Sequence, residues 1–88
     1  MSALRRVDRK APGYTRRRHG RGFVYLDGEG RSIRDERLDR VRSLAIPPAW
    51  EDVWICADER GHLQATGMDG AGRLQYLYHP DWRAQRDR

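Results

Sequence analysis

The chain has little of what stabilises secreted, metal-bound or membrane proteins. It has 88 residues and a single cysteine, Cys56, so it forms no internal disulfide and is not a disulfide-rich secreted domain. Cys56 lies in the apolar run of residues 53–56, where we expect a buried, unreactive thiol. That cysteine and the dispersed His19, His62 and His79 match no zinc-ligand spacing. We therefore expect neither a metal nor a cofactor.

Long apolar segments are also missing. No run approaches the roughly 20 residues that a membrane-spanning helix needs, and the N-terminus lacks the apolar core of a signal peptide. We expect a cytoplasmic protein without a membrane partner. No serine–histidine–aspartate or cysteine–histidine set suggests a catalytic group, and the carboxylates are dispersed among arginines as charge partners. We assign no catalytic residue to this chain.

Positive charge is what the chain has in excess. It has 18 Lys and Arg against 13 Asp and Glu, a net charge of +5, and Lys10 is its only lysine. Arginine binds phosphate with a planar two-pronged fork, whereas lysine offers a point charge. A domain with a pI near 10.1 therefore fits a polyanionic partner, although a solvated cationic surface without a partner has the same composition.

The first 21 residues differ in composition from the rest. They are rich in basic residues and poor in apolar ones, and Pro12-Gly13 interrupts any helix that begins near Leu4. Such a block is typical of a flexible arm. We predict that residues 1–21 form a basic arm, disordered until a partner binds, and that residues 22–88 form one small folded domain.

Turn signals divide the folded part into short elements. Residues 22–26 favour a strand, 27–30 a turn, and 31–33 the returning strand of a hairpin. Asp35 is a good N-cap for a helix whose apolar face is spaced three and four residues apart. The residues of that face are Leu38, Val41, Leu44 and Ala45. Pro47 and Pro48 end the helix.

Three more strands are predicted over residues 52–56, 62–66 and 73–79, and Pro80 suits the first turn of a second helix. That helix has no end inside the chain, so we expect the chain to be part of a longer protein. The sum is an α+β domain with a small antiparallel sheet of about five short strands and one or two short helices.

Tyr76 and Tyr78 lie at alternating positions of the last strand and so share one face of it. Two interpretations stay open from the residues alone. Both tyrosines pack beneath the sheet, or both turn outward with Arg73 and the glycine-rich loop 67–72 to bind phosphates. The amide of Gln75 is able to pair with an adenine edge, which slightly favours the second interpretation.

Other motifs are weaker. Residues 21–25 resemble half of an RNA-binding strand motif, but the strand and helix that precede it in that fold are missing. Residues 27–30 and 69–72 contain too few glycines for a phosphate-binding loop.

Six segments in order are far more specific. They are residues 12–17 (PGYTRR), 20–25 (GRGFVY), 44–50 (LAIPPAW), 53–56 (VWIC), 61–67 (GHLQATG) and 72–79 (GRLQYLYH). Together they resemble the N-terminal domain of type IB DNA topoisomerases, in their compact bacterial and poxvirus-like branch. The resemblance implies an enzyme of two domains that closes around double-stranded DNA, and hence a cytoplasmic, nucleoid-associated protein.

The resemblance implies that the chemistry belongs to a C-terminal catalytic domain absent from this chain. There a tyrosine forms a 3′-phosphotyrosyl intermediate, and supercoils relax without ATP or an essential metal. The resemblance places the small N-terminal domain at the major groove. Its implied partners are duplex DNA and the catalytic domain of the same parent chain.

The resemblance also implies contacts for single residues. Arg73, Tyr76 and Tyr78 would touch the DNA backbone, Gln75 would approach base edges, and Arg86 would touch a further phosphate. Leu74 stands where relatives usually have a basic residue, so one contact is expected to be missing. With three arginines from the basic arm, the predicted DNA-binding set is Arg73, Gln75, Tyr76, Tyr78, Arg86, Arg16, Arg17 and Arg18.

Two alternatives remain from the sequence. The domain is a stand-alone nucleic-acid-binding module, or it is a protein-interaction domain whose arginines meet an acidic partner.

Overall fold

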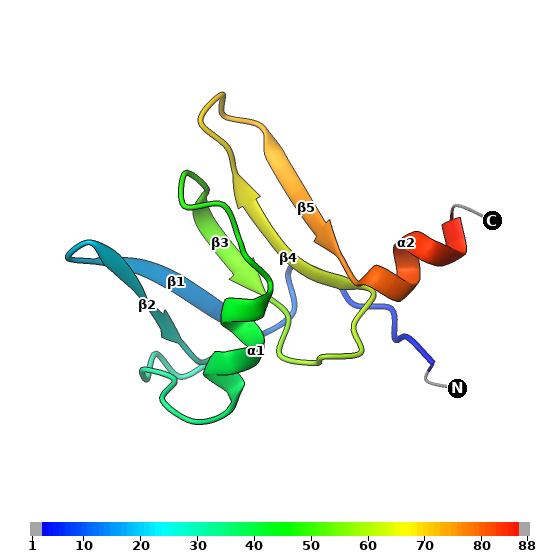
Figure 1. Cartoon of the computed structure of the whole chain (residues 1–88), viewed down its shortest axis with the longest axis horizontal. Coiled ribbons are helices and arrows are strands. Elements are labelled where there is room, and N and C mark those ends of the chain that lie inside the picture. The colour runs from blue at the N-terminus through cyan, green and yellow to red at the C-terminus, as the bar shows by residue number, and fades with distance from the viewer. Residues whose placement is uncertain (1–2, 87–88) are drawn as a thin grey trace.

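The computed structural model describes residues 3–86, with side chains described for residues 3–84. Within that range the chain forms one five-stranded antiparallel sheet and two short helices (Figure 1). The strands are β1 (Tyr14–His19), β2 (Gly22–Leu26), β3 (Glu51–Ile55), β4 (Leu63–Met68) and β5 (Leu74–Tyr78), and the helices are α1 (Arg37–Ser43) and α2 (Pro80–Arg86). The strand order is β2-β1-β3-β4-β5. The predicted α+β class with about five strands is confirmed.

The predicted disorder of the basic arm is wrong for residues 14–19, which form β1. This strand pairs with β2 along its length, from Thr15 opposite Leu26 to His19 opposite Gly22. Gly20, with a φ of 58°, closes the turn between the strands, a conformation that glycine adopts without strain. The arginines of β1 favoured the prediction of a solvated, disordered segment. In the structure, β2 provides the backbone hydrogen-bond partners of β1.

The segment before β1 is also held in place. The backbone N–H of Arg5 donates to the carbonyl of Arg60 at 2.8 Å, and the N–H of His62 donates to the carbonyl of Arg5 at 2.8 Å. The N–H of Val7 donates to Nδ1 of His62 at 3.1 Å. These contacts join the N-terminal segment to the turn that precedes β4.

Residues 31–33 do not form the predicted strand. The turn after β2 does reverse the chain, because Ser32 forms an isolated antiparallel bridge with Leu26 and the N–H of Ile33 donates to the carbonyl of Tyr25 at 2.8 Å. Pairing stops there, since the chain then turns into α1. The hairpin partner of β2 is β1 instead.

Helix α1 supplies most of the cover for the sheet. Val41 is buried and Leu38 and Leu44 pack partly buried against the core, as the spacing predicts. The N-cap is Glu36 rather than the predicted Asp35, although the Asp35 carboxylate accepts the N–H of Arg37 at 3.0 Å. Ala45 does not face the core: it is exposed and left-handed, with a φ of 52°, because the helix has already ended.

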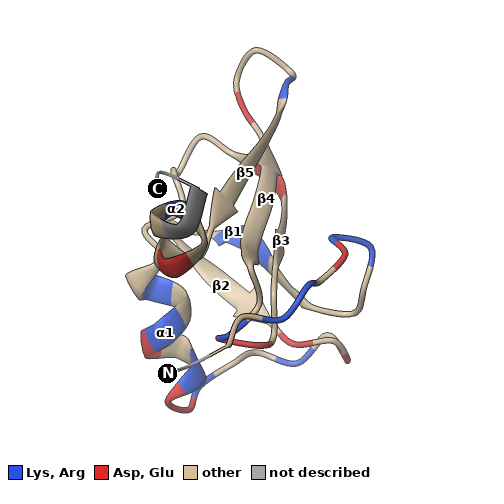
Figure 2. Cartoon of the chain, turned by 90° about the vertical axis from the view of Figure 1, so that its right-hand side faces the viewer, with Lys and Arg blue, Asp and Glu red and all other residues tan. Residues whose placement is uncertain are grey.

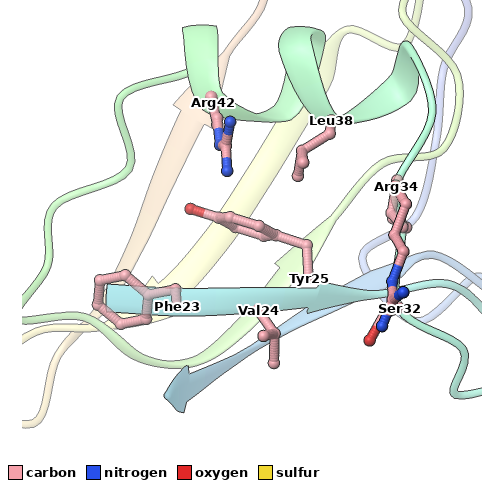
Figure 3. A pocket seen from close by; sticks show the side chains of 8 residues that line it. Phe23, Val24, Tyr25, Ser32, Arg34, Leu38 and Arg42 are labelled. Carbon is pink, nitrogen blue, oxygen red and sulfur yellow. The ribbon is translucent and has the colours of Figure 1, made fainter. Parts of the chain in front are cut away.

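The core lies between α1 and one face of the sheet. Tyr14 is opposite Ile55, Ile55 is opposite Ala65, and Ala65 is opposite Leu77. These residues form a row across four strands beneath the helix. In β2, Tyr25 rises toward Leu38 and Arg42 of α1, whereas Val24 points to the other face (Figure 3). The opposite face of the sheet carries no helix (Figure 2).

Two further predictions hold. Cys56 is buried, with 4% of its surface exposed. Helix α2 begins at Pro80 as expected, and His79 caps it, because Nδ1 of His79 accepts the N–H of Asp81 at 3.0 Å.

Candidate nucleic-acid interface

The β4–β5 hairpin ends in a turn that one aspartate organises. Oδ1 of Asp69 accepts the backbone N–H groups of Ala71 and Arg73, both at 2.9 Å. Oδ2 accepts Nε2 of Gln75 at 2.7 Å. The hydrogen bond from the Arg73 backbone, followed by the one from Gln75, holds the pKa of Asp69 below its ordinary value. The Asp69 carboxylate therefore accepts hydrogen bonds from within the turn, while the Arg73 side chain points outward.

Arg73 and Gln75 lie on the same side of this hairpin tip. Nε of Arg73 is 3.9 Å from the same Asp69 oxygen that Gln75 binds, and the Arg73 side chain is 77% exposed. Gln75 alternates with Tyr76 and shares its face with Leu77, which packs against the core. The Gln75 amide nitrogen is thus occupied by Asp69, while the guanidinium of Arg73 is open to a partner.

Tyr76 and Tyr78 turn away from the core. Tyr76 is 46% exposed and Tyr78 is half-buried. Their rings stack with centroids 6.0 Å apart and an interplanar angle of 17°, which fixes them as a pair. Between them Leu77 points to the opposite face, so the interpretation that places both tyrosines in the core beneath α1 is wrong.

The face on which the tyrosines lie includes residues that were not predicted from the sequence. Thr15, Trp54, Thr66 and Tyr76 follow one another in register across β1, β3, β4 and β5. Nε1 of Trp54 donates to the carbonyl of Ala11 at 2.9 Å, which anchors the indole over the segment before β1. The alternation of Trp54 with buried Val53 and Ile55 was a signal for this outward position, but it does not reveal which strands are neighbours.

The three arginines of β1 separate onto two faces. Arg16 donates to the carbonyls of Ile46, Pro47 and Trp50 at 3.2, 2.9 and 2.9 Å. Arg18 donates to the carbonyl of Pro48 at 3.3 Å, and both guanidiniums lie over the ring of Phe23. Arg17 points to the other face, is exposed, and has no hydrogen bond or ion pair with the described residues. Arg16 and Arg18 hold the 46–50 loop, whereas the Arg17 guanidinium has no such contact with the described residues.

A groove of about 240 Å³ lies where β1 and β3 diverge. The two strands pair only at Tyr14 and Thr15, and β3 is irregular between Glu51 and Trp54, with Asp52 left-handed at a φ of 51°. Arginines of β1 line one side of the groove, and Glu51 and Asp52 line the other. The groove therefore has carboxylates opposite its arginines.

The predicted residues do not all meet on one surface. Tyr76, Tyr78 and Arg17 belong to the open sheet face, Arg73 and Gln75 to the other side of the hairpin tip, and Arg16 and Arg18 to the α1 side. Arg86 lies outside the residues whose side chains the structure describes. Leu74 is half-buried beside the tyrosines, and it offers no charge at the position where the resemblance implies a basic residue.

Among the described residues, no cluster of three or more histidine, cysteine, aspartate or glutamate side chains is placed to hold a metal ion. None of the helices described here is both long and apolar enough to cross a bilayer.

These features define a small antiparallel α+β domain with a basic hairpin tip and an open aromatic face. Residues 22–69 match the family model "Bacterial DNA topoisomerase IB, N-terminal domain", which is more than half of the chain. The chain therefore belongs to the N-terminal domain family of bacterial type IB DNA topoisomerases. The match ends at Asp69, so the turn that follows and β5 lie outside it.

A viral relative supports the same assignment. Over 68 residues, the chain is 35% identical to a protein of Acanthamoeba polyphaga mimivirus described as DNA topoisomerase 1B. The aligned part is 76% of this chain and 20% of the relative, so the chain spans about a fifth of the relative's length.

Proposed function

We propose that this domain binds double-stranded DNA as the N-terminal part of a type IB topoisomerase, whose separate catalytic domain relaxes supercoils through a 3′-phosphotyrosyl intermediate. The domain itself carries no catalytic residue in this proposal. The parent enzyme is bacterial, works in the cytoplasm at the nucleoid, and needs no cofactor. Its two partners are duplex DNA and the catalytic domain.

One observation carries the proposal: the β4–β5 hairpin is a two-stranded ribbon whose charge is confined to its turn (Figure 2). The major groove of B-DNA is about 12 Å wide and accepts such a ribbon. A ribbon in the groove reaches phosphates on both sides of it, which suits Arg73 on one side of the tip and Tyr76 on the other. The separation of these residues onto two faces therefore fits groove entry better than flat docking.

The other basic hairpin supports a second contact. From residue 11 to residue 26 the chain has no acidic residue and carries Arg16, Arg17, Arg18 and Arg21. With Arg16 and Arg18 partly used by backbone carbonyls, we assign the phosphate contact of β1 to Arg17. The two turns lie at the same end of the sheet, because β1 and β4 both run antiparallel to β3. In Figure 1 the β1–β2 turn is at the left and the β4–β5 turn is at the top.

A titration with a short duplex, followed by amide chemical shifts, tests the proposal. We expect residues 73–78 and Arg17 to respond together, while the amides of α1 stay unchanged. In the same assay Tyr76→Phe lowers affinity by about three- to tenfold at unchanged thermal stability, because a hydroxyl-to-phosphate hydrogen bond is worth roughly 1 kcal/mol. Absence of binding at low salt would contradict the proposal and favour an acidic protein partner for the arginines.

A further inference from the structure

The chain contains the same turn twice. Residues 27–31 (DGEGR) and 69–73 (DGAGR) share aspartate, two glycines and arginine at the same positions. In both turns the aspartate Oδ1 accepts the N–H groups of the third and fifth residues, at 2.9 and 3.0 Å in the first and at 2.9 Å for both bonds in the second. The fourth residue is a left-handed glycine, with a φ of 80° at Gly30 and 76° at Gly72.

The remaining backbone hydrogen bonds agree as well. The aspartate N–H donates to the carbonyl of the fifth residue at 2.8 Å in the first turn and 2.9 Å in the second. The N–H of the glycine donates back to the aspartate carbonyl at 3.0 Å in both turns. The two turns thus place an arginine at the same position on the same backbone, and any difference between the arginines comes from side chains.

The difference lies at the third position. In the first turn Glu29 forms an ion pair with Arg31, whose Nη2 is 3.2 Å from the Glu29 carboxylate, and both side chains are largely exposed. In the second turn Ala71 has no charge to offer. The nearest carboxylate oxygen to Arg73, on Asp69, is 3.9 Å away and already accepts the Gln75 amide.

An exposed ion pair adds little to the free energy of unfolding, but its carboxylate still changes the electrostatic potential around the arginine. A carboxylate 3–4 Å from a guanidinium lies well inside the Debye length of about 8 Å at physiological salt, so each such carboxylate lowers the positive potential that a nearby phosphate meets. The aspartate of each turn acts on its own arginine, but Arg31 also has the Glu29 carboxylate beside it, whereas Arg73 has no second carboxylate. Arg73 therefore attracts an anion more strongly than Arg31 does.

We propose that the third residue of this repeated turn decides which of the two hairpin tips contacts phosphate. Ala71 leaves Arg73 available, and Glu29 keeps the equivalent Arg31 out of the interface. Ala71 is thus a specificity-determining residue of the DNA surface although it makes no contact itself. This inference rests on the proposed DNA binding.

Four single variants test it by duplex affinity measured across a salt series. Ala71→Glu transplants the acidic residue into the second turn, and Ala71→Gln is its control of equal size. Glu29→Gln removes the acid from the first turn, and Arg73→Ala removes the contact itself. Thermal midpoints check that all four variants fold. We expect them to fold, because residues 29 and 71 are exposed and their side chains make no hydrogen bond with the described residues other than the Glu29–Arg31 ion pair.

We expect Ala71→Glu and Arg73→Ala each to weaken binding by about five- to tenfold near 0.1 M salt and to reduce the salt slope by about one. Ala71→Gln stays within twofold of the parent chain, whereas Glu29→Gln strengthens binding by at least about twofold, because Arg31 is then released to contact phosphate. If Arg73→Ala weakens binding but Ala71→Glu behaves like Ala71→Gln, the role of position 71 is overturned while DNA binding stands. If Glu29→Gln binds no more tightly than the parent chain, the role of Glu29 is overturned, because removing its carboxylate does not bring Arg31 into contact with phosphate. If the parent chain does not bind, or Arg73→Ala changes nothing, the proposed mode of binding itself fails.

Discussion

Adjacent arginines of β1 have opposite environments. The guanidinium of Arg16 spans three backbone carbonyls of the 46–50 loop and lies 4.0 Å from the centre of the Phe23 ring. Arg17, one residue later, points to the open face. In a strand, successive side chains alternate between faces. Arg16 therefore has a structural role, and Arg17 is exposed and has the binding role only in the proposed function.

Lysine substitution separates these roles. Arg16→Lys is expected to lower the free energy of unfolding by about 1–3 kcal/mol. The reason is that a lysine ammonium group lacks the planar set of N–H donors with which the guanidinium reaches all three carbonyls. Arg17→Lys should leave stability within about 0.5 kcal/mol of the parent, since exposed residues without partners rarely matter to stability. Urea unfolding measures both. Equal losses for the two variants would contradict the division.

At the scale of elements, β4 and the 46–50 loop pack closely against each other at Gly67. A Cβ atom on Gly67 would lie 2.8 Å from Cε3 and 3.0 Å from Cβ of Trp50, a partly buried member of the core. Glycine at this position lets the indole lie flat on the strand. The loop that Arg16 holds from one side is thus packed against β4 from the other.

Alanine substitution tests this packing. Gly67→Ala is expected to destabilise the domain by about 1–3 kcal/mol, because the added methyl group forces Trp50 or the strand to move. Gly70→Ala is the matched control, since a Cβ atom there meets nothing within 4 Å. Its stability should be unchanged or slightly higher. If Gly67→Ala has the same thermal midpoint as the control, the 46–50 loop moves away from the added methyl group without loss of stability, and the packing argument is contradicted.

At the scale of the whole molecule, positive charge is spread along a domain that measures 42 × 32 × 21 Å. The net charge of +5 favours a polyanionic partner in the proposed function, but several arginines already have partners among the described residues. Among the described residues, the ion pairs are Arg5–Asp58, Arg31–Glu29, Arg37–Asp35, Arg60–Asp81 and the longer Arg73–Asp69. The phosphate contacts should therefore be fewer than the number of arginines.

We expect about four to six phosphates to be neutralised, so that log affinity falls with log salt at a slope of about −4 to −5. Binding isotherms with a duplex of fixed length between low and physiological salt measure the slope. A slope near −10 would mean that the paired arginines also contact DNA, and a slope near zero would exclude phosphate binding altogether.

Much of the fold follows from local patterns. The turn at residues 69–72, the apolar spacing of Leu38, Val41 and Leu44, and the start of α2 at Pro80 were each predictable, because they depend on neighbours within a few residues. The alternation of Tyr76 and Tyr78 predicted their shared face. It left open which face that was, because the answer depends on where α1 docks.

The sequence by itself determined the fold class, the excess of arginine, the family resemblance and the positions of most turns, since backbone preferences and periodicity act over short distances. Only the tertiary structure decided that residues 14–19 join the sheet, that Arg16 serves carbonyls some thirty residues away, and that Asp69 holds Gln75 and leaves Arg73 exposed. Each of these results depends on hydrogen bonds that the folded chain directs to particular partners. Composition counts such charged groups but does not say what they bind.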